Sequence, residues 1–180
     1  IIGIAGWKNS GKTTLAVRLV EELTARGFRI ATIKHAHHAL RLDEEGTDSA
    51  RHRAAGAQQV AVVSQKRWAL MTEGPEPDFA EVVTRLEPCD LVVVEGYKSQ
   101  PIAKIEARRR DSQPNFGLAE RDENEIAIAA DYTVENAKVP VFGSDDVQAI
   151  ANFVVAKFQL KRDAYSAMQS AFPGPPHLYR

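Results

Sequence analysis

This 180-residue chain has a single cysteine, Cys89, and almost no net charge. One cysteine cannot form an intrachain disulfide, and such scarcity is typical of a protein from a reducing compartment. The 23 basic and 24 acidic residues give a formal charge of −1, which argues against nucleic-acid binding driven by bulk positive charge. No apolar run is long enough to span a bilayer, and no secretory signal is recognisable. We therefore expect a cytoplasmic protein with no membrane or nucleic-acid partner.

A phosphate-binding pattern lies near the start of the chain. Residues 6–13 match G-x-x-x-x-G-K-[ST], the Walker A loop, whose glycines let backbone N–H groups surround a phosphate. Lys12 supplies a charge for the β- and γ-phosphates, and Thr13 offers a hydroxyl to Mg²⁺. The apolar run 1–5 before the loop and the helical spacing of 12–26 after it provide the required strand and helix. The predicted phosphate loop consists of Gly6, Trp7, Lys8, Asn9, Ser10, Gly11, Lys12 and Thr13.

Strand and helix patterns alternate through most of the remaining sequence. This alternation favours an α/β fold of the P-loop NTPase type, a mainly parallel sheet flanked by helices. The segments 59–63 and 67–72 predict an added antiparallel hairpin. We expect one nucleotide-binding domain over residues 1–160 and a tail over 161–180, disordered or held by a partner. The other expected strands are 28–34, 91–94, 102–107, 125–130 and 139–142, and the other expected helices are 48–55, 79–86 and 146–158, the last capped by Asp145 or Asp146.

Two carboxylates are candidates for binding Mg²⁺ or positioning the attacking water. Ligands bind at the carboxyl ends of parallel strands, and Glu95 follows the continuously apolar strand 91–94 in the Walker B position. Asp90 begins that strand, about 16 Å away at the wrong end of the sheet, and is interpreted as structural. Asp48, in the segment after the second strand, is interpreted either as a magnesium or water-positioning residue or as the cap of its helix.

Other polar residues follow the predicted strands. His35, His37 and His38 come after the second strand and are interpreted as metal ligands, as part of the nucleotide site or as a polar loop. The run 108–110, all arginine, is interpreted as a solvated edge rather than as a phosphate or partner contact. Asp131 follows the strand 125–130, at a place where an acidic residue can read a base.

Four segments together resemble the MobB family of molybdopterin-guanine dinucleotide biosynthesis adapter proteins. The resemblance extends from residue 1 to about 158 and implies a dimeric GTP-binding protein with weak GTPase activity. It also implies assistance to MobA, which joins GMP to molybdopterin to make the guanine dinucleotide cofactor. Guanine preference rests on the resemblance, because the N-K-x-D signature is missing. The segments are 6–15, ending in Thr14 and Leu15; Lys34-His35 with His37-His38; 46–57, with Gly46-Thr47-Asp48-Ser49; and 90–98, with Glu95-Gly96-Tyr97-Lys98.

Two alternatives to the adapter role remain open from the residues alone. A metal-delivery GTPase would use the histidine loop, although such proteins usually add cysteine or a longer histidine-rich stretch. A small-molecule P-loop kinase would need an acceptor site and a lid rich in arginine, for which Arg51 and Arg53 are the available side chains. GTP and Mg²⁺ are the expected cofactors under the adapter reading. Its site residues are those of the loop with Thr14, His35, Asp48 and Glu95.

Overall fold

The computed structural model describes residues 1–36, 43–112 and 122–161 and divides the chain into two compact units. The first unit combines Ile1–His35 with Leu86–Arg180, and the second is Ala36–Arg85. The second unit is thus inserted into the chain of the first. Of the predicted tail, only Lys161 lies within the described residues. No helix in the described part of the chain is long and apolar enough to cross a membrane.

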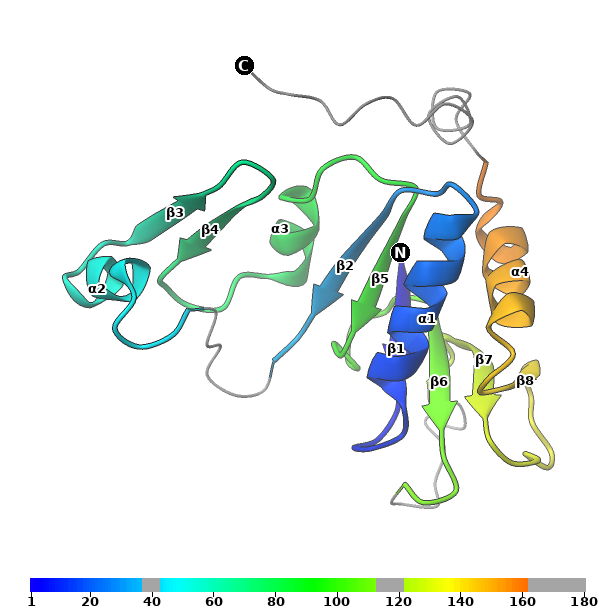
Figure 1. The fold of residues 1–180 in the computed structure, drawn as a ribbon. Helices are drawn as coiled ribbons and strands as arrows, with labels where there is room; N and C mark the ends of the chain where they lie inside the picture. The colour runs from blue at the N-terminus through cyan, green and yellow to red at the C-terminus, as the bar shows by residue number, and fades with distance from the viewer. Residues whose placement is uncertain (37–42, 113–121, 162–180) are drawn as a thin grey trace. The chain divides into compact units, whose positions relative to one another are not determined.

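The first unit contains a six-stranded sheet in which every neighbouring pair is parallel. The strand order is β2-β5-β1-β6-β7-β8. Although β1 comes first in the chain, it lies inside the sheet, between β5 and β6. In Figure 1 the arrowheads of β2, β5, β6 and β7 point toward the same edge of the sheet. This confirms the predicted α/β fold with a mainly parallel sheet. The strands are β1 (Ile2–Ala5), β2 (Ile30–Lys34), β5 (Leu91–Glu95), β6 (Lys104–Arg108), β7 (Glu125–Ala130) and β8 (Val141–Gly143).

Helices α1 (Lys12–Ala25) and α4 (Val147–Phe158) pack on one face of this sheet and bury its core. Each helix contributes apolar side chains at helical spacing, which is how an amphipathic helix covers a sheet. Helix α4 is capped by Asp146, whose Oδ1 accepts from the N–H of Ala149 at 3.1 Å. The core contains Leu15, Leu19 and Leu23 from α1, Ile150 and Val154 from α4, and Ile2, Ile4, Val93, Ile105, Ala127 and Ala129 from the strands.

The opposite sheet face carries buried charge. Lys104 and Glu106 of β6 are 1% and 0% exposed. The Lys104 ammonium lies 2.6 Å from the Asp122 carboxylate, and the Arg108 guanidinium lies 2.8 Å from that of Glu106. Pairing offsets the large cost of taking these charges out of water. Glu125, at the start of β7, is also buried.

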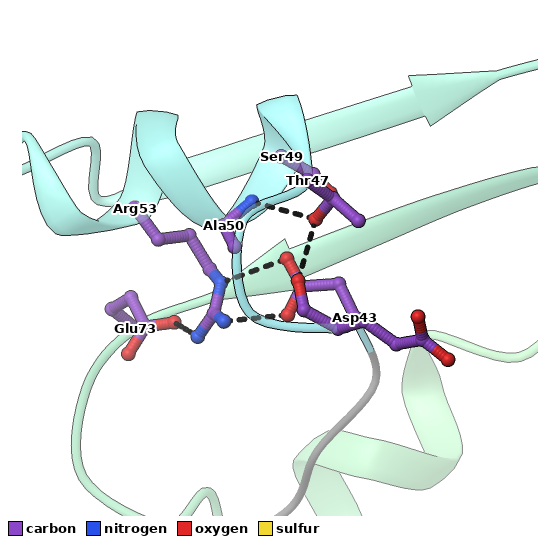
Figure 2. A network of polar contacts seen from close by, with 7 residues as sticks. Asp43, Thr47, Ser49, Ala50, Arg53 and Glu73 are labelled. Carbon is purple, nitrogen blue, oxygen red and sulfur yellow. Dashed lines mark hydrogen bonds and ion pairs between the residues drawn. The ribbon is translucent and has the colours of Figure 1, made fainter.

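The second unit contains α2 (Asp48–Ala54), α3 (Phe79–Thr84) and an antiparallel hairpin of β3 (Gln59–Val63) and β4 (Trp68–Thr72). The hairpin confirms the predicted pairing. In Figure 2, Arg53 of α2 contacts two carboxylates: Asp43 at 2.5 Å, and Glu73, just after β4, at 3.0 Å. These two ion pairs connect α2 to the loop before it and to the end of the hairpin.

The predicted capping role of Asp48 is wrong. Thr47 is the N-cap of α2, and its hydroxyl accepts from the N–H of Ala50 at 3.3 Å (Figure 2). Thr47 has the extended backbone of a capping residue, whereas Asp48 is already helical. The acidic side chain of Asp48 in the first turn is still favourable to the helix dipole.

Candidate functional site

The phosphate loop connects β1 to α1 through backbone conformations that require its glycines. Gly6 has φ +139°, and a Cβ there would lie 2.4 Å from Ser10 Oγ and 2.5 Å from the Ala107 carbonyl oxygen. Gly11 has φ +90° and is the N-cap of α1. Asn9 also has a positive φ, 64°, a conformation that asparagine tolerates better than most side chains. The loop therefore ends at a helix N-terminus, where free N–H groups and the helix dipole favour an anion.

Lys12 begins α1, and its side chain folds back over the loop. The ammonium donates a hydrogen bond to the Trp7 carbonyl at 2.6 Å. Partial burial lowers the pKa of Lys12, and the positive charge of nearby Lys98 lowers it further. The pKa of Lys12 is also lowered by Lys34 and raised by Glu95. Positive charges therefore lie close together at the loop, and a bound polyphosphate would reduce the repulsion between them.

Thr13 and Glu95 meet although 82 residues separate them in the chain. The Thr13 hydroxyl donates to Glu95 Oε1 at 2.6 Å. They meet because β5 pairs in parallel with β1, which brings the carboxyl end of β5 beside the loop. The Lys34 ammonium, at the end of β2, lies 3.4 Å from the same Glu95 oxygen. A hydroxyl and a carboxylate are oxygen ligands of the kind that Mg²⁺ prefers, so this pair suits a magnesium ion.

Aromatic and basic side chains surround the same end of β5. The Lys98 ammonium lies over the Trp7 ring, 4.6 Å from its centroid. The rings of His35 and Tyr97 are 4.5 Å apart, and the His35 N–H donates to the Glu95 carbonyl at 2.9 Å. His35 therefore lies next to the site beside Glu95. His37 and His38 fall outside the described residues, among which no group of three His, Cys, Asp or Glu side chains is placed to hold a metal ion.

The interpretation of the arginine run as a solvated edge is wrong for Arg108, whereas Arg109 and Arg110 are exposed as expected. Arg108 forms the half-buried pair with Glu106. Arg109 lies against the phosphate loop, since a Cβ on Gly11 would be 2.8 Å from its Nε. The placement of Arg109 depends on β6 lying next to β1, which the local sequence does not reveal. The N–H of Arg110 donates to Asp131 Oδ1 at 2.9 Å.

The remaining predicted site residues are placed as follows. Lys8, Asn9 and Thr14 are exposed on or just after the loop. Asp48 belongs to the second unit, where its carboxylate is 91% exposed and lies 3.6 Å from the Arg51 guanidinium. Its role in magnesium binding stays a prediction. Asp90 contacts Arg29 through its carboxylate at 2.9 Å, as expected of a structural residue.

Sequence reasoning did not identify Lys34 and Lys98 as part of the site. Lys34 is the last residue of β2 and Lys98 comes three residues after the end of β5, and nearness to the end of a parallel strand was the available signal. The carboxyl ends of such strands meet at one edge. Arg109 stands in the same position relative to β6.

Comparisons with known proteins agree on one family. The family model described as "MobB: Molybdopterin guanine dinucleotide synthesis protein B" matches residues 1–131. The molybdopterin-guanine dinucleotide biosynthesis adapter protein of Haemophilus influenzae is 40% identical over 158 residues, covering 86% of each chain. That of Escherichia coli is 40% identical over 164 residues, covering 88% of this chain and 93% of its own.

Solved structures extend the agreement to the fold. The crystal structure of Bacillus subtilis MobB matches with a TM-score of 0.70 at 27% identity, covering 90% of this chain and 98% of that one. A MobB homologue from Bacillus stearothermophilus gives a TM-score of 0.68 at 25% identity, covering 89% and 98%. The family match, the two relatives and the shared fold show that this chain belongs to the MobB family of molybdopterin guanine dinucleotide biosynthesis proteins.

Proposed function

We propose that this chain is a GTP-binding adapter that assists MobA when GMP is joined to molybdopterin, and that it hydrolyses GTP slowly with Mg²⁺. The single observation that carries the nucleotide part is the contact between Thr13 of the phosphate loop and Glu95. This contact brings two oxygen ligands together at the end of the loop where the γ-phosphate is expected. The adapter part comes from membership of the family.

The charges of the loop support polyphosphate binding. The positive charges of Lys34 and Lys98 act on Lys12, and a nucleoside triphosphate would neutralise all three charges. Proton affinity and phosphate binding are linked, because the pKa of Lys12 is lowered by burial and by Lys98. Phosphate binding is therefore expected to raise the pKa of Lys12 and hold its ammonium in the charged form.

Thr13 and Glu95 fit the role of magnesium ligands, directly or through water. Mg²⁺, when bound, neutralises charge on the phosphate oxygens during phosphoryl transfer. Glu95 is partly buried, with 15% of its side chain exposed, which keeps the carboxylate oriented toward Thr13. Arg109 lies against Gly11, so its guanidinium is available to the phosphates. Ras-type enzymes without an arginine finger turn over at about 10⁻⁴ to 10⁻³ s⁻¹, and we expect a similarly slow rate here.

The protein acts as a homodimer in the cytoplasm under this proposal, and the hairpin of the second unit supports the dimer. Antiparallel register places Val63 opposite Trp68 and Ala61 opposite Leu70, so these side chains share one face. Val63, Trp68 and Leu70 are 76%, 67% and 50% exposed. Large apolar side chains gathered on one face are typical of a surface that binds another protein. We assign this face to a second copy of the chain.

The test measures nucleotide binding and adapter activity separately. Binding of GTP and ATP with Mg²⁺ is compared for the wild-type chain, Lys12→Ala and the control Lys157→Ala, which changes an exposed lysine near the end of α4. Lys12→Ala is expected to lose tight binding while keeping its far-UV spectrum, and Lys157→Ala to retain tight binding. Formation of the guanine dinucleotide cofactor by MobA is then measured with and without each protein.

Three results would contradict the proposal. GTP affinity of Lys12→Ala within a few-fold of the wild type would remove the phosphate role of that lysine. Fast turnover by the chain alone, with no effect on MobA, would favour a kinase. Tight binding of Ni²⁺ with no binding to MobA would favour a metal-delivery GTPase.

A further inference from the structure

The ammonium of Lys34 competes with any divalent cation for the carboxylate of Glu95. It lies 3.4 Å from Glu95 Oε1, the same oxygen that accepts from the Thr13 hydroxyl at 2.6 Å. The hydroxyl of Thr13 and the carboxylate of Glu95 are the oxygen donors that suit Mg²⁺. A residue of the chain itself thus supplies a positive charge to the carboxylate that a metal ion would use.

The other two lysines near the loop have different partners. The Lys12 ammonium donates to the Trp7 carbonyl at 2.6 Å, and the Lys98 ammonium lies 4.6 Å from the centroid of the Trp7 ring. The side chain of Lys34 is 61% exposed, whereas that of Glu95 is 15% exposed. The long and exposed lysine side chain can therefore turn to a new partner, while the more buried carboxylate stays in place.

The backbone around Lys34 is held by the sheet. Lys34 is the register partner of Glu95 in the parallel pair of β2 and β5, which lie side by side in Figure 1. The N–H of His35 donates to the Glu95 carbonyl at 2.9 Å, and the His35 ring lies 4.5 Å from that of Tyr97. A change of partner by the Lys34 ammonium therefore requires rotation of its side chain and no movement of the strand.

A γ-phosphate is the anion that this end of the loop offers to a displaced ammonium. Thr13 lies at the end of the loop where the terminal phosphate is expected, and in phosphoryl-transfer sites the metal ion bridges β- and γ-phosphate oxygens. The flexible four-carbon stem of Lys34 spans the short distance from Glu95 to that phosphate. Hydrogen bonds between an ammonium and a phosphate are charge-assisted and strong. A nucleoside diphosphate lacks the γ-phosphate and leaves the displaced ammonium without this partner.

We propose that the Lys34 ammonium exchanges between Glu95 and the γ-phosphate, and that this exchange makes the site select a nucleoside triphosphate over a diphosphate. The inference rests on the proposed nucleotide binding at the phosphate loop. A divalent cation alone has to compete with Lys34 for Glu95. A triphosphate that arrives with the cation also supplies the anion that accepts the ammonium. Binding of the cation and of the γ-phosphate is therefore coupled, and each favours the other by the same factor.

The first measurement compares the affinities of GTP and GDP, each with Mg²⁺, by titration calorimetry. Lys34→Met keeps most of the side-chain length without the charge, and it should weaken GTP at least about 10-fold. The same variant should weaken GDP less than about 3-fold. Lys34→Arg keeps the charge and should restore most of the preference for GTP. Lys157→Met, which changes an exposed lysine of α4, is the matched control and should leave the ratio of the two affinities unchanged.

The second measurement uses Mn²⁺ alone, without nucleotide, and follows the free ion by electron paramagnetic resonance. Mn²⁺ takes the same kinds of oxygen ligand as Mg²⁺. Because Lys34→Met removes the competing ammonium, it should bind Mn²⁺ at least about 3-fold more tightly than the wild type. The gain should disappear when Lys34→Met is combined with Glu95→Gln. This double-mutant cycle shows whether the lysine acts through that carboxylate.

The outcomes separate the exchange from the proposed function. Equal losses of GTP and GDP affinity in Lys34→Met overturn the exchange and leave nucleotide binding at the loop intact. Unchanged Mn²⁺ affinity in Lys34→Met, or a gain that persists with Glu95→Gln, overturns it as well. Failure of the wild type to bind either nucleotide overturns the proposed function and the exchange together. Unchanged far-UV spectra and melting temperatures exclude misfolding as the cause of lost affinity.

Discussion

Glu125 is a buried carboxyl group whose ionisation the fold opposes, and replacing it should change how stability depends on pH. The residue is 4% exposed, and among the described residues its Oε2 has no hydrogen-bond partner. Burial, assisted by the negative charge of Glu106, raises the pKa of Glu125 to about 8 from its ordinary value of 4.5. The positive charges of Lys104 and Arg108 lower the pKa of Glu125, and the negative charge of Asp122 raises it further.

The sign and size of the effect follow from linkage. Below about pH 4.5 Glu125 is protonated in the folded and unfolded states and does not change the free energy of unfolding. As the pH rises toward 8, the unfolded chain ionises while the folded protein keeps the proton, so stability falls. Between these pH values each pH unit lowers the free energy of unfolding by about 1.4 kcal/mol. At pH 7 the total loss is about 3 kcal/mol. Above about pH 8 the folded carboxyl also ionises and the cost becomes constant.

Glu125→Gln removes the ionisation but keeps the size of the side chain. Replacing the carboxyl group by an amide also changes the free energy of unfolding by an amount that does not vary with pH. The comparison of how that free energy changes with pH is independent of this amount. Relative to the wild type, the variant should gain about 3 kcal/mol of unfolding free energy between pH 5 and pH 8. The assay is urea denaturation followed by far-UV circular dichroism at pH 5, 6, 7 and 8.

Glu123→Gln is the matched control, because Glu123 is exposed and belongs to the same turn. Its stability difference from the wild type should stay constant over this range. If the difference for Glu125→Gln is equally constant, Glu125 ionises in the folded protein as an ordinary glutamate does. The reasoning from its burial would then be refuted.

Three other predictions concern the loop and the sheet. Glu95→Gln keeps the shape but removes the charge beside Thr13, so single-turnover GTP hydrolysis should fall more than GTP affinity; equal losses would mean that the carboxylate only supports binding. Gly6→Ala brings a Cβ within 2.5 Å of the Ala107 carbonyl oxygen, so calorimetry should show at least about a 10-fold loss of GTP affinity and thermal melts a loss of about 1–3 kcal/mol. The Arg29 guanidinium holds the pKa of Asp90 below its ordinary value, so Asp90→Asn should cost about 1 kcal/mol in urea denaturation at pH 7 and less as the pH falls below about 4.

Local patterns predicted the strands and helices well because each pattern depends on neighbouring residues. The strands Gln59–Val63 and Glu125–Ala130 have the predicted ends. The glycines that stop two helices, Gly27 and Gly56, have φ of 89° and 100°. Positive φ at these positions is easy for glycine and ends a helix.

Contacts between distant segments could not be predicted in the same way. The sequence of β6 alternates charged and apolar residues, a pattern typical of a strand with one solvated face. In the fold Lys104 and Glu106 are buried, because Asp122 and Arg108 compensate their charges. The contact between Arg109 and Gly11 likewise depends on β6 lying beside β1. The Lys104–Asp122 and Arg109–Gly11 contacts follow from the strand order, which no local pattern encodes, whereas Arg108 and Glu106 pair within β6.

The insertion of Ala36–Arg85 between β2 and β5 has a consequence for how this protein can vary. These strands are direct neighbours in a parallel sheet, so any chain joining them must return from the end of one to the start of the other. Such a return requires a dozen or more residues even in its simplest form. The second unit occupies a connection that the sheet needs in any case. Its length and surface can therefore change while Ile30 remains opposite Leu91. The unit with the exposed apolar hairpin can thus diversify independently of the unit that holds the phosphate loop.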